Sequence, residues 1–392
     1  MVLMKKLKVS VYSVGRSDLD RYIPFLYDLK QNKKISLSIY LGKAHFLKKF
    51  GLTYKEFLKK GFSIKPRKYL GTFSDSEKAV AQNIAEETKY LNENFNKDKP
   101  NFLVLLGDRY EILAGACASL GYNIPIIHLF GGAVTEGAID EQIRHAITKI
   151  SHLHFVAHKK YKERLISMGE EPWRIKVIGI PVLKIMKNYK TINKRKLSKI
   201  IKIDLTKPTA LITFHPVTLE ASKTNFYINN LLSSIKSSNL QAIFSYPNMD
   251  LGHQKIISKI KKFVNKNNKK YTIIKNASGF LYTNLLRVTQ VMIGNTSSGI
   301  VEAASFNIPV VNIGDRQKGK IIPSHVINVG YSIKNIKNGI KKSQSKTFLE
   351  KIKNMKNPYE IYPFKEKFSN FLLRTNLNKN LLKKKFFEVK IK

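Results

Sequence analysis

Residues 102–111 of the chain read FLVLLGDRYE, and residues 124–145 read IPIIHLFGGAVTEGAIDEQIRH. In both stretches a continuous apolar run ends at a glycine turn, and charged or histidine side chains follow. An unbroken apolar run of this length is typical of a parallel strand that is buried on both faces. Ligands of parallel sheets bind beyond the carboxyl ends of the strands. The two stretches therefore predict an α/β fold with a functional site at one edge of a sheet.

Strand-like and helix-like segments alternate through the rest of the chain, which implies parallel sheets. A long helix is expected over 74–91, where Ser74 and Glu77 have the spacing of a capping box. Another helix is expected from about 18 to 29. A last helix is expected from about 364 to 377, followed by a frayed basic tail from 378. Strands are expected at 8–14, 35–41, 102–106, 124–129, 153–157, 175–178, 209–214, 241–245, 271–274, 291–293 and 309–313.

The length of 392 residues favours two domains at roughly 150 residues each. Strand character is lost and lysine is gained over 181–199, so we place the boundary there. We expect an N-terminal Rossmann-like domain over 1–188 and a C-terminal one over 189–392. The last helix is expected to pack back toward the first domain.

The bulk composition is that of a globular protein, with 43% hydrophobic and 25% charged residues. Cys117 is the only cysteine, so no disulfide framework is possible, which fits a reducing compartment. No apolar run approaches the roughly 18 residues that a membrane span needs. The first residues also lack the apolar region and cleavage site of a secretory signal. These features predict a cytoplasmic protein.

The formal net charge of +43 could indicate a nucleic acid or an anionic membrane surface as a partner. The excess, however, is mostly lysine spread along the whole chain, together with abundant isoleucine and asparagine. AT-rich codons produce that joint bias. The interleaved basic and aromatic residues of an RNA-binding module are missing. We therefore favour a genomic bias and expect no specific nucleic-acid partner.

A second polar turn lies in the other half of the chain, where residues 294–303 read GNTSSGIVEA after an apolar run. Glycines let a backbone approach a ligand closely, and the N–H groups of a helix N-terminus favour a phosphate. Glu302 could accept the hydroxyls of a ribose. An ordinary Thr or Ser helix cap is the alternative. His215 and Asn248 follow two further strands and are expected at the same sheet edge.

Three further groups of polar residues allow a functional or a structural interpretation. Arg16 lies in the first strand–helix turn, which lacks the GxGxxG pattern of NAD sites; it could hold a pyrophosphate or be a surface arginine. Asp140 and Arg144 are four residues apart, as are Glu141 and His145, which suits either surface ion pairs or a site. We favour structural roles over a metal site for His152, His154 and His158.

These motifs resemble, in order and from Val11 to about Val329, those of the hydrolysing UDP-N-acetylglucosamine 2-epimerases. The matching stretches are 107–109, 135–149, 215–216, 247–248, 294–299 and 315–317. The resemblance implies two facing Rossmann-like domains of the GT-B type, with the sugar nucleotide in the cleft between them.

The resemblance also implies a reaction. UDP leaves by anti elimination, and hydration of the resulting 2-acetamidoglucal inverts C2. The products would be UDP and N-acetylmannosamine, or a 2,4-diacetamido trideoxy analogue. Such sugars feed sialic or legionaminic acid synthesis for cell-surface polysaccharide. Neither a metal nor another cofactor is needed, because positioned side chains move the protons. By analogy, the protein would be a homodimer or homotetramer.

Site residues follow from the same resemblance. Tyr282 would stack on uracil, and Arg316 would lie near the nucleotide. The full set expected to hold UDP is Arg16, Arg109, His215, Asn248, Tyr282, Thr296, Ser297, Glu302 and Arg316. The set expected to carry the acid–base chemistry is Asp108, Asp140, His45, His145 and Arg144.

The chain departs from the family at two positions of the first stretch. The family commonly has an acid or a histidine where this chain has Phe130, and an acid where it has Ala133. Two alternatives to the epimerase therefore stay open. One is a GT-B glycosyltransferase, which shares the fold and the phosphate turn. The other is a catalytically impaired protein that binds a nucleotide sugar.

Overall fold

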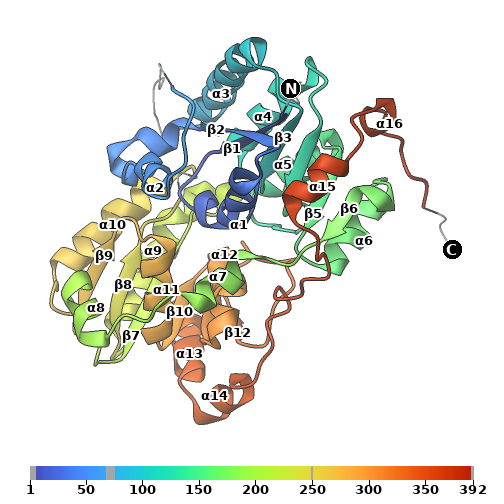
Figure 1. The fold of residues 1–392 in the computed structure, drawn as a ribbon. Coiled ribbons are helices and arrows are strands. Elements are labelled where there is room, and N and C mark those ends of the chain that lie inside the picture. The colour runs from blue at the N-terminus through green and yellow to red at the C-terminus, as the bar shows by residue number, and fades with distance from the viewer. Residues whose placement is uncertain (1–5, 68–75, 249, 390–392) are drawn as a thin grey trace. The chain divides into compact units, whose positions relative to one another are not determined.

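The computed structural model describes residues 6–67, 76–248 and 250–389. The chain forms two compact units (Figure 1). The first unit comprises the chain up to Ala133, then Ile139–Val182, and the chain from Ile361 onward. The second comprises Val134–Ala138 and Leu183–Glu360. The sequence predicts a boundary after residue 188, with the last helix of the second domain packing back toward the first. The compact units instead divide after Val182, and the segment from Ile361 belongs with the first.

The first unit contains a six-stranded parallel sheet of order β2-β1-β3-β4-β5-β6. Its strands are β1 (Leu7–Ser13), β2 (Ile35–Leu41), β3 (Phe102–Leu106), β4 (Ile126–Leu129), β5 (Leu153–Val156) and β6 (Ile175–Val177). Its helices are α1 (Asp18–Gln31), α2 (Tyr54–Lys59), α3 (Glu77–Lys97), α4 (Tyr110–Leu120), α5 (Asp140–Ile150), α6 (Lys159–Ser167), α15 (Phe368–Arg374) and α16 (Lys379–Leu382), with 3-10 turns at Lys43–Phe46, Lys48–Phe50 and Pro172–Arg174. The strands β3 and β4 are buried along their whole length, as their sequence predicts.

The second unit contains a six-stranded parallel sheet of order β12-β11-β10-β7-β8-β9. Its strands are β7 (Thr209–Thr213), β8 (Gln241–Ser245), β9 (Tyr271–Ile274), β10 (Val291–Gly294), β11 (Val310–Ile313) and β12 (Val326–Val329). Its helices are α8 (Lys194–Ile201), α9 (Thr224–Lys236), α10 (His253–Asn265), α11 (Gly279–Val288), α12 (Ser297–Val301), α13 (Ile333–Ser343) and α14 (Lys346–Ile352), with 3-10 turns at Thr218–Lys223 and Ala303–Phe306. The helix α7 (Val182–Asn188) begins at the unit boundary.

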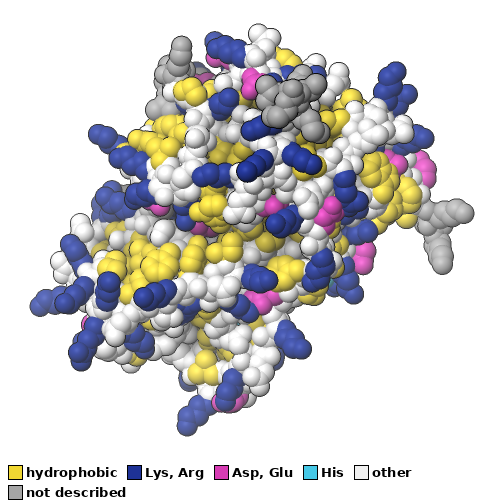
Figure 2. All heavy atoms as spheres, in the orientation of Figure 1, with side chains coloured by type: hydrophobic (Ala, Val, Ile, Leu, Met, Phe, Trp, Pro, Cys, Tyr) yellow, Lys and Arg dark blue, Asp and Glu magenta, His cyan; other side chains and the backbone are white. Residues whose placement is uncertain are grey.

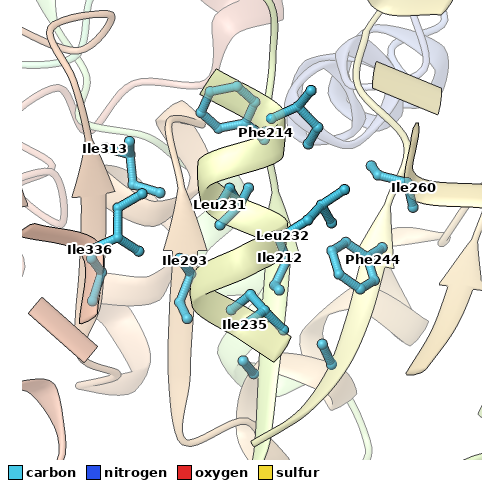
Figure 3. Packing of buried hydrophobic residues seen from close by; sticks show 14 of the residues in the cluster. Ile212, Phe214, Leu231, Leu232, Ile235, Phe244, Ile260, Ile293, Ile313 and Ile336 are labelled. Atoms are coloured by element: carbon cyan, nitrogen blue, oxygen red, sulfur yellow. The ribbon is translucent and has the colours of Figure 1, made fainter. Parts of the chain in front are cut away.

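The core of the second unit lies between its sheet and the helices that cover it. Figure 3 shows Leu231 and Ile235 of α9 packed toward Ile212 of β7 and Ile293 of β10. Each of these side chains is at most 1% exposed. Burying one such side chain contributes roughly 1.5–3 kcal/mol, so this layer fixes the strand ends that carry the polar turns.

Every strand predicted from the sequence is present, with ends shifted by up to two residues. The strand β12 is missed. The capping box proposed at Ser74 falls outside the described residues. The cap seen in the structure is Ser76, whose hydroxyl accepts a hydrogen bond from the Ala79 amide at 3.3 Å.

The C-terminal segment of the first unit is more ordered than the sequence predicts. The last long helix is α15, which packs beside α1 and β5 (Figure 1). Both the amide and the hydroxyl of Ser369 donate to the carboxylate of Asp28, at 2.7 and 2.9 Å. The predicted frayed tail is wrong for residues 378–387, because this segment contains α16 and bonds to the body of the unit. No helix in the described part of the chain is long and apolar enough to cross a membrane.

Candidate active site

The polar turns after β3 and β4 lie at one edge of the first sheet. Leu106 and Leu129 are register partners, so the turns that follow them are neighbours. Gly107 has a φ of +81°, and its amide donates to the carbonyl of Leu129 at 2.9 Å. The carbonyl of Gly107 in turn accepts a hydrogen bond from Nε2 of the buried His128, at 2.7 Å. Asp108 follows this fixed glycine, and its side chain remains 33% exposed.

Arg144 organises the carboxylates around Asp108. Its side chain lies on α5 and is fully buried. Nε donates to Oδ2 of Asp108 at 3.0 Å, and a second guanidinium nitrogen reaches the same oxygen. Nη1 donates to the carbonyl of Ala133 at 2.9 Å and to Oε2 of Glu141 at 2.6 Å. Burial by itself would lower the pKa of Arg144, but the charge of Asp108 raises it above its ordinary value. The arginine is thus a permanent cation that holds Asp108 in one position.

His145 and Asp140 complete the polar face of α5. Nε2 of His145 lies 2.9 Å from Oε1 of Glu141, so the predicted pair four residues apart is confirmed. Asp140 is the first residue of the helix and is partly buried. Its charge also favours the protonated form of Arg144. Glu141 therefore bridges Arg144 and His145, a role that the sequence motif does not reveal.

His45, the remaining histidine of the expected acid–base set, lies in the 3-10 turn Lys43–Phe46. It is fully buried beside Phe57, and burial lowers its pKa to about 3. Nε2 lies 3.0 Å from the hydroxyl of Ser13, and Nδ1 lies 2.8 Å from the hydroxyl of Thr53. Both ring nitrogens are thus occupied within the fold. This geometry fits a histidine that fixes the end of β1, and the catalytic role of His45 stays a prediction.

The turn that carries Arg16 is built around Asp18. Oδ2 of Asp18 accepts from the amides of Val14 and Gly15, at 2.8 and 2.9 Å, and from the hydroxyl of Ser13 at 3.3 Å. A Cβ on Gly15 would lie 3.8 Å from the side chain of Arg109. Arg16 itself is partly exposed. The two arginines of this unit that are expected to hold UDP, Arg16 and Arg109, therefore lie at neighbouring turns, where Arg109 also pairs with Glu111 at 3.2 Å.

In the second unit, His215 joins three strand ends. Its amide donates to Oδ1 of Asn295 at 2.7 Å, and Nδ2 of Asn295 donates to the carbonyl of His215 at 2.9 Å. The amide of Asn248 donates to Nδ1 of His215 at 3.2 Å. The loops after β7, β8 and β10 are therefore locked together, as expected for His215 and Asn248. Asn295 has the central role, which its place in the glycine turn could have suggested.

The turn after β10 leads directly into α12. Thr296 is the helix cap, and its hydroxyl accepts from the amide of Ser298 at 3.3 Å. Ser297 is the first helical residue, and Glu302 follows the last one and is 8% exposed. The hydroxyl of Tyr282 on α11 bonds to that of Ser298. Tyr282 therefore lies beside the proposed phosphate turn, through a contact with Ser298 that the motif alone does not show.

Arg316 lies at the same sheet edge of the second unit and is 8% exposed. Nη1 donates to the carbonyl of Asn295 and Nη2 to Oδ2 of Asp250, both at 3.4 Å. The neighbouring Gln317 donates to the same carbonyl at 2.7 Å. A Cβ on Gly137 would lie 2.9 Å from Cα of Arg316, so only glycine fits there. Of the nucleotide residues expected in this unit, His215 and Arg316 thus bond directly to Asn295.

Phe130 and Ala133, the two positions singled out in the sequence, have structural roles. Phe130 has a φ of +66°, which is rare for a bulky residue. Its ring packs edge-on against Phe25 at 6.5 Å, with the guanidinium of Arg21 6.0 Å from its centroid. Ala133 contributes the carbonyl that Arg144 holds. Neither position supplies a proton carrier.

The histidines near β5 serve the fold. Nδ1 of His152 accepts from the amide of Ile126 at 3.1 Å, Nε2 of His154 lies 3.0 Å from Glu170, and Nδ1 of His158 accepts from the Lys160 amide at 3.1 Å. Within residues 6–67, 76–248 and 250–389, no group of three or more His, Cys, Asp or Glu side chains could hold a metal ion.

Known proteins share this fold. At a TM-score of 0.75 the structure resembles a UDP-GlcNAc 2-epimerase from Neisseria meningitidis bound to UDP-GlcNAc, with 16% identity over 90% of this chain and 96% of that one. At 0.74 it resembles the Methanocaldococcus jannaschii UDP-GlcNAc 2-epimerase in complex with UDP-GlcNAc and UDP, with 19% identity over 94% and 99% of the two chains. The fold is accordingly GT-B-like, with a Rossmann-like α/β unit in each half.

Sequence similarity is closer for two curated relatives. A GDP/UDP-N,N'-diacetylbacillosamine 2-epimerase (hydrolyzing) of Campylobacter jejuni is 36% identical over 88% of this chain and 89% of its own length. A UDP-N,N'-diacetylbacillosamine 2-epimerase (hydrolyzing) of Legionella pneumophila is 34% identical over 86% and 89%. The family model of the UDP-N-acetylglucosamine 2-epimerases matches residues 27–372. The chain belongs to this family.

Proposed function

We propose that the protein is a hydrolysing 2-epimerase of UDP-sugars, which releases UDP and the free 2-epimeric manno sugar. The observation that carries the proposal is the acid–base group of the first unit, in which a buried Arg144 holds Asp108 beside a histidine–glutamate pair. Similarity to hydrolysing relatives at 34–36% identity supports it. The glycosyltransferase alternative is not favoured, because these relatives are epimerases.

The reaction needs two proton transfers and one molecule of water. A base removes the C2 proton while the bond between C1 and the UDP oxygen breaks, which gives a glycal and UDP. Water then adds its oxygen to C1, and an acid delivers a proton to C2 from the opposite face. We assign these transfers to Asp108, Asp140 and His145, with Arg144 as the positioning residue that holds Asp108.

We assign nucleotide binding in the second unit to the residues around Asn295. The uracil would lie against Tyr282, and the pyrophosphate against the Thr296 turn and Arg316. Glu302 would accept the ribose hydroxyls. Arg16 and Arg109 of the first unit are further cations suited to the pyrophosphate. The hydrogen bonds that join His215, Asn295 and Asn248 support this assignment, since they fix three strand ends at one sheet edge.

For the substrate we favour a UDP-2,4-diacetamido-trideoxy sugar over UDP-N-acetylglucosamine. The support is the activity of the two relatives, which are both 2-epimerases of N,N'-diacetylbacillosamine nucleotides. Phe130 and Ala133 also remove polar groups near the catalytic turn, which suits a sugar with fewer hydroxyls. The product would supply the synthesis of a sialic or legionaminic type acid for a surface polysaccharide. Cytoplasmic location and a homodimer or homotetramer stay predictions.

Product analysis tests the proposal. The protein is incubated in D2O with UDP-N-acetylglucosamine, with UDP-N,N'-diacetylbacillosamine and with the GDP-linked analogue, and the products are followed by NMR. We expect free UDP, a manno sugar with deuterium at C2, and faster turnover of the diacetamido substrate. Intact sugar nucleotides in every sample would contradict the proposal, and tight UDP binding in those samples would identify an impaired binding protein.

A further inference from the structure

The C-terminal residues 378–388, called the strap below, are bound to the first unit by a buried charge. Glu170 is fully buried and is bonded to three cationic or polar groups. Lys149 donates to Oε1 at 2.8 Å, and Lys384 of the strap donates to Oε2 at 2.7 Å. Nε2 of His154 also lies 3.0 Å from Oε2. Leaving a buried carboxylate without its partners is costly, so Lys384 has a defined place in the fold.

A second buried residue binds the strap backbone. Arg174 is 1% exposed, and its guanidinium donates to the carbonyls of Leu381, Asn380 and Lys383, at 2.9, 3.1 and 3.2 Å. The amide of Phe387 donates to the carbonyl of Gly169 at 2.9 Å. The strap therefore has one fixed position, although more than two hundred residues separate Arg174 from it along the chain.

Lys384 also caps the helix that carries the acid–base group. Its Nζ donates to the carbonyls of Thr148 and Lys149, at 3.0 and 2.7 Å, in the last turn of α5. The last carbonyls of a helix have no intrahelical partners, and a cation there complements the helix dipole. One ammonium group thus ties the C-terminal end of α5 to Glu170.

Two hydrogen bonds connect the last turn of α5 to the turn that carries Asp108. The hydroxyl of Thr148 lies 3.3 Å from Nδ1 of His128, and Nε2 of the same ring bonds to the carbonyl of Gly107. Asp108 is the next residue, and Arg144 of α5 holds it. A shift of the last turn of α5 would therefore reach Asp108 both through the helix and through His128.

We propose that Lys384 is a positioning residue of the reaction, and that the strap sets the place of α5 and hence of Arg144 and Asp108. The inference rests on the proposed function, because that function defines Asp108 as an acid–base group. Misplacing a reacting group by about 1 Å can cost roughly 100-fold in rate, so the strap is expected to act on kcat. Binding of UDP, assigned to groups that do not contact the strap, is expected to stay unchanged.

The test uses the full chain with Lys384→Met, and Lys383→Met as the matched control at the adjacent exposed lysine. We expect Lys384→Met to lower kcat about 10- to 100-fold, with KM and the Kd for UDP within twofold of the control. Lys384→Arg keeps the charge and the donors and is expected to retain most of the activity. Equal kcat for Lys384→Met and Lys383→Met would overturn the proposal.

Two further measurements separate positioning from other causes. The double variant Glu170→Gln, Lys384→Met removes the buried unpaired carboxylate; it should stay slow, and full activity in it would overturn the positioning role. Hydrogen–deuterium exchange should be faster at residues 147–151 in Lys384→Met and unchanged in the control, and unaltered exchange would also overturn the proposal. The exchange measurement does not depend on turnover. If the wild-type protein had no activity, the proposed function would be refuted, and the exchange rates would still test whether the strap positions α5.

Discussion

At the scale of single residues, Asp108 is the carboxylate most completely prepared for chemistry. It follows a glycine fixed by two hydrogen bonds, and a buried arginine holds it while one third of its side chain remains open. We expect Asp108→Asn to lower kcat by about 10²- to 10⁴-fold, the usual contribution of a positioned acid or base. The Kd for UDP, measured by calorimetry, should not change.

Asp98→Asn is a matched control for that variant, because Asp98 lies in the same unit and pairs with Lys8 at the surface. The control should keep wild-type kcat, since exposed ion pairs contribute about 0–1 kcal/mol. If Asp108→Asn retained more than half of the control's kcat, the assignment of Asp108 would be wrong.

His45 illustrates a residue whose role depends on burial. The pKa of its ring is lowered from 6.5 to about 3, because burial disfavours the charged form. Below pH 6.5 the unfolded chain binds a proton at this position, and the folded chain does so only near pH 3. Stability is therefore fully present above pH 6.5 and falls as the pH drops toward 3. At pH 5 the loss is about 2 kcal/mol for this one histidine.

The measurement is urea unfolding of the wild type and of His45→Gln at pH 7 and pH 5. The variant is expected to be less stable at both values, because it loses the packing and the ring bonds. Its loss between pH 7 and pH 5 should, however, be about 2 kcal/mol smaller than that of the wild type. An identical pH dependence in the two proteins would mean that His45 is protonated in the folded state.

At the scale of elements, the strands were the part most open to prediction, because buried parallel strands appear as unbroken apolar runs. The strand β12 has no such run, since Val326 and Asn328 within it are not buried. The strap was missed for another reason. Its partners Arg174 and Glu170 are distant in sequence, and a local pattern of basic residues carries no sign of them.

Whether a site residue could be predicted also depended on whether local sequence places it. Strand-end residues such as Asp108 and His215 could be predicted, because topology alone brings them to a sheet edge. The bridging role of Glu141 could not, since the motif does not show that its carboxylate bonds to both Arg144 and His145. For Asn295 the glycine turn was the only signal, since its role arises from hydrogen bonds between loops. The contacts of His45 could not be predicted either, because the hydroxyls that enclose its ring, those of Ser13 and Thr53, lie on separate elements.

The turn between β10 and α12 depends on one backbone position. Gly294 has a φ of +144°, and a Cβ there would lie 1.9 Å from the carbonyl oxygen of Thr213. Gly294→Ala must shift the backbone of β7 or of the turn, so we expect a loss of about 3 kcal/mol and weaker UDP binding. Gly121→Ala is the control, because nothing lies within 4 Å of its Cβ and its φ is −62°.

Thermal unfolding and UDP titration of both glycine variants decide the matter. The control should match the wild type or exceed its stability by up to about 1 kcal/mol. Wild-type stability and UDP affinity in Gly294→Ala would show that the turn is less constrained than its backbone indicates.

At the scale of the whole molecule, the charge of +43 remains without an assigned role. Lysine and arginine side chains are scattered among hydrophobic and other residues over the face seen in Figure 2, and do not gather in one patch. Charge spread in this way attracts polyanions without selecting among them. Proteins bind DNA in this non-specific mode by releasing counterions, so the affinity falls steeply with salt.

We therefore expect duplex DNA to bind weakly and without sequence preference at 50 mM salt, and to lose at least 100-fold in affinity by 200 mM. Turnover of the sugar nucleotide should be insensitive to DNA at the higher salt, because a site made of fixed hydrogen bonds depends less on ionic strength than dispersed charge does. Fluorescence anisotropy with two unrelated duplexes, alongside the UDP-release assay, measures both quantities. Preference for one duplex, or inhibition that persists at 200 mM salt, would show that the positive charge forms a dedicated surface and is more than a bias of composition.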